Sequence, residues 1–590
     1  MRLLTFLTLA IPALAQLDLK THFNTAALSK PFNPVKEAYW TGYPHHRRTP
    51  FALSPDGSTA YLAYLDASET DVHIQSIDPK TFEATGTSVT VKGAKEAGGL
   101  VAHDDGFALL TNEALAAGTA NAPPDNTPVA VLYRFTAGGE QSWKTYLGGP
   151  AVTGSDLLAS PDLNGDLVFS SEAGYYAAYI VVTSYSGSAS GHFGDAIRYV
   201  TPDGSLEDIP GASSSWGCSH NTGIAFEAAD APPFASICAE DQGAIWLNTE
   251  TQGMGNNGVK ISNEVVINGG SNEPVGGTSG SYSSMARFIG QSSYIFSWVS
   301  RGAVDLTENE WMGAGYTKSQ NRTSNRNVAI ALFSDKTTLV GEQATSQVGA
   351  ADGDKQINWI TQGSADCSNA HAATFDGSNA LVSWEEIANP ICDFVAMGCR
   401  GDFTGTFYQA VNEAGDKVGE PVKSTDSYVA GDMVTMPDGR ICWPFVDMEW
   451  RLDAPARGLP SSETTEMSFA CIGNGSSGSN DSETSPGTST AEKLPSTTSS
   501  QSSQVETQES SVTATDTDAS TTSVPELTTE VDDAVTSVPE TTAQTQATES
   551  AAVTGTVSEA APPAVSGTLS SSVSKTCPPK TVWTTFTVYA

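Results

Sequence analysis

Three of the eight histidines stand directly before short β-prone segments, where an imidazole could act as a general base or acid. They are His46, His220 and His371. Acidic residues follow similar segments along the chain, and a histidine held among carboxylates can keep its pKa near neutrality. Two carboxylates could instead divide the acid and the nucleophile or base roles of glycoside hydrolysis. The pattern therefore predicts proton-transfer chemistry wherever these segments converge.

The candidate site residues form a catalytic and a substrate-binding group. The catalytic candidates are His46, His220, Tyr282, Arg301 and His371, and the substrate-binding candidates are Arg48, Glu240, Trp384, Glu385 and Asp447. An arginine could neutralise a uronate while a tyrosine donates a proton, and this arrangement would serve β-elimination on an acidic polysaccharide. Structural roles are the alternative, because acidic residues after strands commonly bond turn amides and tryptophans commonly pack in cores.

One unit recurs in the region that must position these residues: an apolar segment, a turn rich in Asp and Gly, and a second apolar segment. Its seven copies lie at residues 51–64, 100–110, 157–169, 224–238, 285–298, 372–384 and 433–443. Further hairpins follow at residues 72–86, 129–147, 196–206, 328–340 and 407–418. Two successive hairpins make a four-stranded blade, and radial repetition of blades protects strand edges. The sequence therefore predicts an all-β fold, a β-propeller of seven four-stranded blades, with six or eight blades as alternatives.

Propeller geometry would bring the candidate residues together. In each blade the inner strand starts at one rim of the axial channel, and the second strand returns to that rim. Residues before each first strand and after each second strand are therefore expected at one axial mouth. The last copy lacks an obvious fourth strand, so a strand near Val35 to Tyr39 is expected to close the ring.

Several segments resemble those of known secreted propellers. The Ser54-Pro-Asp-Gly57 turn and the paired hairpins resemble the broad class that includes polysaccharide lyases, glycosidases and lectins. The segments Trp216-Gly-Cys-Ser-His220 and Ser236-Ile-Cys-Ala-Glu240 resemble secreted propeller-like proteins of no settled function. The resemblance covers most of residues 17–473. It implies the fold and transfers no catalytic residue.

The two ends of the chain indicate secretion. Residues 1–15 have the charged start, apolar core and small-residue cleavage site of a signal peptide. Residues 16–473 are expected to form the propeller domain, 474–575 a disordered glycosylated linker rich in Ser, Thr and Pro, and 576–590 a short β-prone segment. Sequons at Asn321, Asn474 and Asn480 are candidate glycosylation sites.

The eight cysteines of a secreted chain are expected in disulfides rather than in metal sites. The predicted pairs are Cys218–Cys238, Cys392–Cys399 and Cys442–Cys471, and the states of Cys367 and Cys577 stay open. A net charge of −38 argues against nucleic-acid and anionic-membrane partners. No mature segment is apolar enough to span a membrane. No cofactor is predicted, although an acidic mouth could bind Ca²⁺.

Together these observations predict a secreted monomer, extracellular or in the cell wall, that acts on a polysaccharide at one axial mouth as a lyase or a hydrolase. A non-catalytic glycan- or surface-binding protein and a structural cell-wall or adhesion protein are the alternatives. The candidate residues differ from blade to blade, which favours one central site over the repeated pockets of a lectin.

Overall fold

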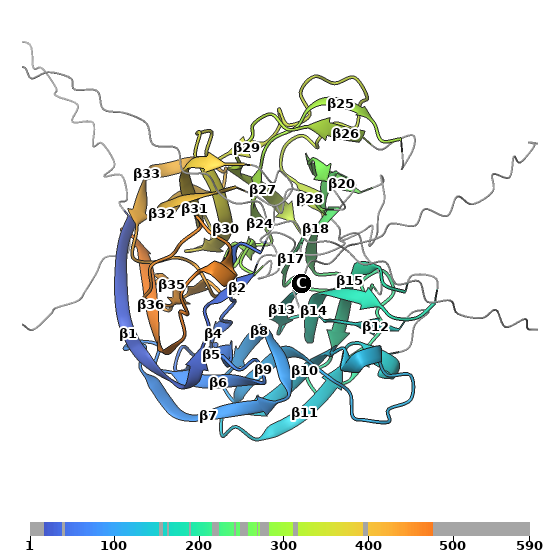
Figure 1. Ribbon diagram of the computed structural model, residues 1–590, viewed down its shortest axis with the longest axis vertical. Coiled ribbons are helices and arrows are strands. Elements are labelled where there is room, and N and C mark those ends of the chain that lie inside the picture. The colour runs from blue at the N-terminus through green and yellow to red at the C-terminus, as the bar shows by residue number, and fades with distance from the viewer. Residues whose placement is uncertain are drawn as a thin grey trace, which may run out of the picture. The chain divides into compact units, whose positions relative to one another are not determined.

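The structure, a computed structural model, describes residues 17–37, 42–152, 157–161, 165–187, 190–214, 223–240, 243–247, 258–267, 270–271, 282–310, 317–392 and 399–475. In this part of the chain, seven antiparallel sheets of four or five strands follow one another around an axis (Figure 1). The predicted all-β, seven-bladed propeller is confirmed. No helix among the described residues has the length and apolar character needed to cross a membrane.

Blades one to three form in chain order. Blade one consists of β4 (Phe51–Leu53), β5 (Ala60–Leu65), β6 (Asp71–Ile77) and β7 (Ala84–Lys92). Blade two consists of β8 (Ala94–His103), β9 (Gly106–Glu113), β10 (Val129–Thr136) and β11 (Gln141–Tyr146). Blade three consists of β13 (Gly165–Ser170), β14 (Tyr175–Ser184), β15 (Phe193–Val200) and β16 (Leu206–Glu207), with β12 (Leu158–Ala159) paired to the end of β14.

Blades four to seven repeat the same meander. Blade four consists of β17 (Ile224–Glu227), β18 (Ala235–Glu240), β19 (Ala244–Leu247) and β20 (Val259–Asn263). Blade five consists of β23 (Met285–Arg287), β24 (Tyr294–Ser300), β27 (Asn327–Asp335) and β28 (Thr338–Leu339), with β29 (Asn358–Trp359) beside β27. Blade six consists of β30 (Asp366–Thr374), β31 (Asn379–Ile391), β32 (Arg400–Asn412) and β33 (Lys417–Ser424). Blade seven consists of β34 (Val434–Thr435), β35 (Ile441–Phe445), β36 (Thr464–Asn474) and β1 (Leu17–Phe32).

Short elements connect or extend the blades. The hairpins are β2 (Val35–Glu37) with β3 (Pro44–His46), β21 (Val266–Ile267) with β22 (Gly270–Ser271), and β25 (Val304–Glu308) with β26 (Thr317–Gln320). The 3-10 turns are η1 (Pro124–Asn126), η2 (Gly149–Ala151) and η4 (Ala456–Gly458).

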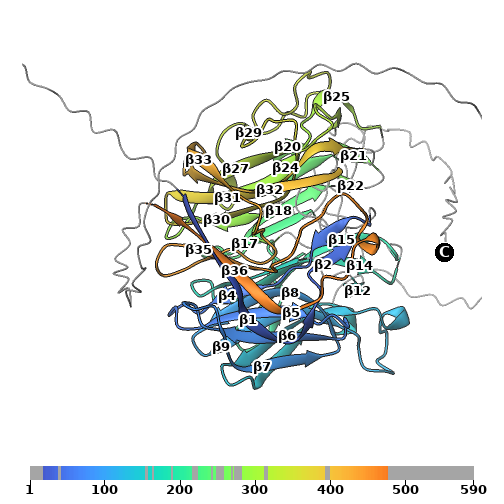
Figure 2. The ribbon, with the colours of Figure 1, turned by 60° about the vertical axis from the view of Figure 1, so that its left-hand side comes forward.

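The ring closes through β1, which pairs antiparallel with β36 and so joins the start of the chain to its last blade. Figures 1 and 2 both show β1 beside β36. The prediction that a strand near Val35 to Tyr39 closes the ring is wrong, because Val35–Glu37 pairs with β3 instead. The 16-residue β1 can follow the whole of β36, and its Leu28 and Phe32 are buried in the core shared with blade one.

Blade three departs from the predicted repeat. Residues 157–169 were expected to supply both strands of the first hairpin, but Gly165–Ser170 alone is the inner strand and pairs with β14. A Cβ at Gly165 would lie 2.5 Å from the carbonyl oxygen of Tyr179, so only glycine fits where β13 begins beside β14. The difference places Asp166 at the start of an inner strand, next to the axis.

The cores lie between neighbouring blades. All six residues of β5 and all eight of β9 are buried, because a blade on each side covers both faces of these middle strands. The outer strands β11 and β33 contain no fully buried residue. Burial on both faces explains why the middle strands are nearly continuous apolar runs rather than alternating ones. It also makes the inner strands a rigid wall around the axis.

Candidate active site

Two cavities are lined by described residues. The axial channel, of about 370 Å³, is lined by the inner strands of all seven blades and by the residues that precede them. The rim cleft, of about 860 Å³, lies between hairpin β2–β3, the β5–β6 turn, the start of β8 and the segment 448–462 after β35. Sites for small ligands commonly have volumes of roughly 300–1,000 Å³. Both cavities are therefore large enough to be considered.

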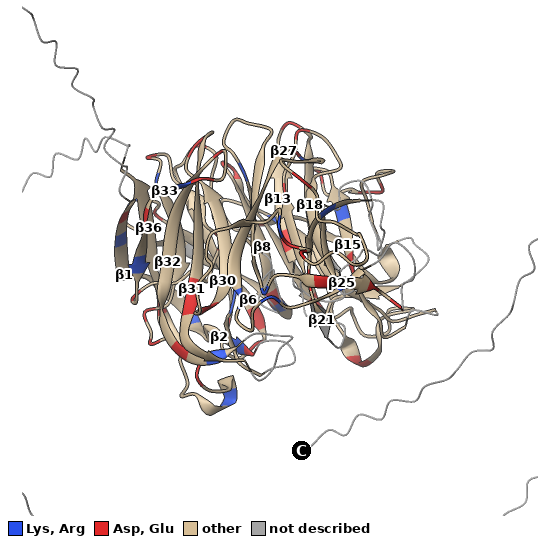
Figure 3. Ribbon diagram, turned by 90° about the horizontal axis from the view of Figure 1, so that it is seen from above, with Lys and Arg blue, Asp and Glu red and all other residues tan. Residues whose placement is uncertain are grey.

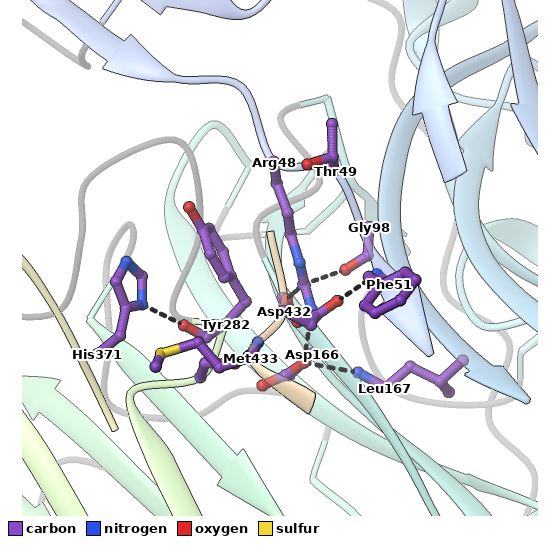
Figure 4. Close-up of polar contacts among 12 residues, drawn as sticks. Arg48, Thr49, Phe51, Gly98, Asp166, Leu167, Tyr282, His371, Asp432 and Met433 are labelled. Atoms are coloured by element: carbon purple, nitrogen blue, oxygen red, sulfur yellow. Dashed lines mark hydrogen bonds and ion pairs between the residues drawn. The ribbon is translucent and has the colours of Figure 1, made fainter. Parts of the chain in front are cut away.

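Arg48 crosses the end of the axial channel where the inner strands begin. Its Nη2 donates to Asp166 Oδ1 at 3.0 Å and to Asp432 Oδ1 at 2.7 Å. Its Nη1 donates to the backbone carbonyls of Gly98 and Gly165. Figure 4 shows the guanidinium close to Gly98, Asp166 and Asp432. Because the partners belong to blades two, three and seven and Arg48 precedes blade one, a single cation joins four blades at the axis.

Two carboxyl groups of the channel hold protons near neutral pH. Burial raises the pKa of Asp166 to about 7, against the opposing attraction of Arg48. Burial also raises the pKa of Glu227 to about 7, and the charge of Asp166 adds to this shift. Glu227 ends β17, and its Oε1 accepts a hydrogen bond from the Ala228 amide at 2.6 Å. Carboxyls with such pKa values can donate or accept a proton at neutral pH.

A buried network centred on Glu385 lies beside the rim cleft. Glu385 Oε1 lies 2.5 Å from His46 Nε2 and accepts from Asn369 Nδ2 at 2.8 Å, while Oε2 accepts from Trp450 Nε1 at 2.9 Å. The His46 ring stacks on Tyr428 and Trp450, with centroids 4.2 and 3.7 Å away. Burial alone would raise the pKa of Glu385, but the charge of His46 and the hydrogen bonds outweigh it and hold the pKa below its usual value.

His371 and Tyr282 link this network to Arg48. His371 Nε2 lies 2.8 Å from Asn369 Oδ1, and its Nδ1 lies 2.9 Å from the Tyr282 carbonyl. The two rings stack at 4.8 Å, and the Arg48 guanidinium lies 4.9 Å from the Tyr282 ring centroid. Burial lowers the pKa of His371 to about 4, so its ring is neutral at pH 7. A neutral imidazole carries one N–H, so His371 can donate to only one of these two oxygens, and the stacking of its ring on Tyr282 helps to hold that tyrosine in place.

The structure brings together half of the ten predicted site residues and separates the others. The five that meet are His46, Arg48, Tyr282, His371 and Glu385. Arg301 is buried in blade five, where its Nε donates to the Ser324 carbonyl at 2.9 Å. Trp384 is 3% exposed and stacks on Phe407, so its face is covered by the core. Asp447 is exposed and accepts from Asn24 at 3.4 Å. His220 and the side chain of Glu240 lie outside the described residues.

The disulfides Cys392–Cys399 and Cys442–Cys471 are confirmed. Cys238 is also disulfide-bonded, but its predicted partner Cys218 lies outside the described residues, as do Cys577 and Asn480. Cys367 is a buried free thiol. Asn321 is half-buried and Asn474 is buried at the end of β36, and glycosylation at both stays a prediction.

Two channel carboxyls, Asp166 and Glu227, are absent from the sequence-based candidates, whereas Asp432 stands before an inner strand, where propeller geometry places it at the mouth. A signal for Asp166 exists, because Gly165-Asp-Leu-Val168 and Gly431-Asp-Met-Val434 are near copies, and both aspartates bind Arg48. Glu227 has no such signal, since it stands at the edge of the insertion between β17 and β18. Among the described residues, no group of three or more His, Cys, Asp or Glu side chains is placed to hold a metal ion.

Comparison with known proteins does not identify a family. No protein-family model matches the sequence. No curated protein matches it either. A member of the DUF4221 family from Bacteroides vulgatus is 10% identical with a TM-score of 0.32, over 78% of this chain and 100% of that one. An α-L-arabinofuranosidase from Fusarium graminearum, solved with an iminosugar inhibitor, is 10% identical with a TM-score of 0.31, over 75% and 98%. The WD40 domain of Toxoplasma gondii coronin is 8% identical with a TM-score of 0.33, over 78% and 88%.

The sequence identities and TM-scores of these three structures are too low to indicate a fold or an activity for this chain. The assignment of the fold therefore rests on the chain's own seven sheets.

Proposed function

We propose that the protein is an extracellular carbohydrate-active enzyme that hydrolyses a glycosidic bond in the axial channel. The observation that supports this most is the presence of two carboxyl groups, Asp166 and Glu227, in the lining of one channel. Glycoside hydrolysis needs two such groups, one protonated and one ionised. The disulfides are in keeping with an extracellular location. A channel of about 370 Å³ suits the end or a branch of a polysaccharide rather than its middle.

Glu227 is the proposed general acid. Its carboxyl accepts from the Ala228 amide, and burial raises its pKa enough to outweigh the opposing charge of Arg287, so a proton is available at neutral pH. That proton goes to the glycosidic oxygen as the bond to the sugar breaks. Asp166 is the second carboxyl: its pKa of about 7 leaves part of it ionised at neutral pH, and Arg48, which donates to one of its oxygens, favours that form. The Asp166 carboxylate can accept a proton from the attacking water or stabilise the positive charge on the sugar ring.

Hydrolysis fits the arrangement better than β-elimination. Elimination on a uronate needs a free cation near the sugar carboxylate, but Arg48 is already bonded to two carboxylates and two carbonyls. Tyr282 and His371, the other elimination candidates, are buried and do not line the channel, whereas the residues that follow them, Ser283 and Ala372, do. A proton donor must reach the reacting bond, and Glu227 can do so.

A polysaccharide panel tests this proposal. Reducing ends report hydrolysis, and the ultraviolet absorbance of unsaturated sugars reports elimination. We expect reducing ends without unsaturated products, activity that falls above about pH 7 as Glu227 ionises, and a loss of about 10²- to 10⁴-fold in kcat for Glu227→Gln. Glu140→Gln, in the exposed β10–β11 turn, is the matched control.

Each other outcome contradicts part of the proposal. Unsaturated products would assign the cleavage to elimination. Full activity of Glu227→Gln would remove that residue from the mechanism. Binding of a glycan without any cleavage would favour the non-catalytic alternative.

A further inference from the structure

The rim cleft has a charge balance unlike that of the rest of the protein. Its lining contains five basic residues, Lys36, Arg47, Lys95, Arg451 and Arg457, and four acidic ones, Glu37, Glu69, Glu96 and Glu449. The whole chain has 29 basic against 67 acidic residues. Figure 3 shows blue and red segments close together around β2. Because charges act over only about 8 Å at physiological salt, an anion near this cleft experiences mainly the local balance.

We propose that the rim cleft is a second binding site, which takes an anionic segment of a polysaccharide. The site is distinct from the axial channel. The inference rests on the proposed function only in taking the ligand to be a carbohydrate. The ligand groups that it recognises are the carboxylates or sulfates of an acidic sugar chain.

Two ion pairs form the fixed wall of the rim cleft. Arg47 is buried, and it donates to the Asn33 carbonyl at 3.1 Å and to Glu69 Oε1 at 2.6 Å. Lys36 Nζ lies 2.8 Å from Glu96 Oε1 and ties hairpin β2–β3 to blade two. These pairs hold the wall in place before a ligand arrives, which lowers the entropy cost of binding.

Two cations of the rim cleft remain available to a ligand. Lys95 Nζ donates to the Glu69 carbonyl at 3.0 Å, so its charge meets a neutral acceptor rather than a carboxylate. Arg457 lies in η4, is exposed, and forms no ion pair within the part of the chain that the structure describes. Glu449 is also exposed in the lining and opposes them. Removing a basic side chain should therefore weaken anion binding, and removing the acidic Glu449 should strengthen it.

Two consecutive residues separate the rim cleft from the axial channel. Arg47 lines the cleft, and the next residue, Arg48, lines the channel. Successive side chains of an extended segment point to opposite sides, so this stretch forms the partition between the two cavities. A sugar chain held in the cleft would lie close to the channel. A nucleic acid fits poorly here, because it needs several phosphate contacts and the molecule's net charge of −38 repels it.

Calorimetric titration of the full chain tests the proposal. The probes are a uronic-acid oligosaccharide, a sulfated oligosaccharide and the carboxyl-reduced, neutral form of the first. We expect the anionic probes to bind and the neutral one to bind at least tenfold more weakly, with affinity that falls as salt rises. Lys95→Gln combined with Arg457→Gln should weaken binding about five- to tenfold, and Glu449→Gln should tighten it about two- to threefold. Lys20→Gln removes an exposed charge on β1 and should change nothing.

Several outcomes would overturn the proposal. Equal binding of the neutral probe would remove the anionic requirement. Unchanged binding in the double variant, or the same weakening in Lys20→Gln, would place the ligand elsewhere. Val168→Trp, which narrows the channel at a half-buried lining position, separates the two sites, because a ligand in the rim cleft should bind this variant as it binds the wild type. If Val168→Trp abolishes binding, the ligand occupies the channel and the cleft site is wrong. If it abolishes only cleavage, both sites stand.

Discussion

The axial channel and the rim cleft both contain arginines facing carboxylates, but water reaches them to very different degrees. In the channel, the Arg48 side chain is 7% exposed, and those of Asp166 and Asp432 are 11% and 17% exposed. In the cleft, Glu69 is 59% exposed beside the buried Arg47, and Arg451, whose partner Asp453 lies outside the lining, is 42% exposed, whereas Lys36 and Glu96 in the fixed wall are only 17% and 18% exposed. Similar ion pairs therefore stand in two different dielectric environments.

The difference in hydration decides what each set of charges does. A buried charge has lost its hydration, so its partner becomes essential and its pKa shifts easily. An exposed pair keeps most of its hydration and is screened by salt, so it contributes little stability but can attract a ligand. The channel is therefore suited to proton transfer, and the rim cleft to recognition.

Removing the cation from each region is the strongest test of this contrast. Arg48→Met would leave Asp166 and Asp432 facing each other without a counter-charge, and we expect a loss of about 3–5 kcal/mol in the free energy of unfolding. The matched variant Arg451→Met removes an exposed arginine paired with Asp453 and should leave the denaturation midpoint unchanged. Urea denaturation at neutral pH measures both. Equal shifts in the two variants would show that hydration does not distinguish the regions.

The sequence predicts the ring better than it predicts the channel. The paired hairpins identify the blades because each strand carries its own apolar run and turn. The grouping of His46, Arg48 and Glu385 follows from propeller geometry, since all three flank strands at one rim. Arg301 and Trp384 satisfy the same rule, yet they are buried in the blades. The position of a residue along a strand determines at which end of the blade it lies, but not whether its side chain points toward the axis.

The missed carboxyls have a physical explanation. In blade three, Leu158–Ala159 is apolar and precedes a turn, so it imitates an inner strand, whereas the true inner strand begins at Gly165. That shift hides Asp166 in a predicted second strand. The closing strand β1 is hard to recognise because its burial is irregular along 16 residues and its partner β36 lies at the far end of the fold. Both features depend on contacts between segments distant in the sequence.

The pH dependence of stability tests the channel with a smaller expected effect. The pKa of Glu227 is about 7 in the folded protein, above its ordinary value of about 4.5. The folded state therefore binds more protons than the unfolded state between these values, and the contribution of Glu227 to stability decreases as pH rises from about 4.5 through 7. Between about pH 5 and pH 7.5, the free energy of unfolding of the wild type should therefore fall by about 1–3 kcal/mol more than that of Glu227→Gln.

The effect of Glu227 must be measured as the difference between the stability–pH curves of the wild type and of Glu227→Gln, because other groups also shape each curve. His371 acts with the opposite sign, because its pKa is lowered to about 4 and its contribution is lost as pH falls from about 6.5. Subtracting the wild-type curve from that of Glu227→Gln cancels this contribution. Parallel curves for the two proteins would contradict the raised pKa of Glu227. Glu449→Gln in the rim cleft is the matched control, since its carboxyl is exposed and should leave the curve unchanged.

The smallest expected effect concerns an uncharged polar group at the channel wall. The hydroxyl of Tyr282 is buried and has no hydrogen-bond partner among the described residues. Tyr282→Phe removes an unsatisfied group, so stability should stay the same or rise by up to about 1 kcal/mol. Tyr408 is the matched control, because its buried hydroxyl lies 3.1 Å from Ser427 Oγ, and Tyr408→Phe should cost about 1 kcal/mol. A loss in Tyr282→Phe as large as that in Tyr408→Phe would mean that the Tyr282 hydroxyl is bonded in solution. In that case, removing a neutral polar group near the axis would destabilise the protein, as removing the charge of Arg48 is expected to do.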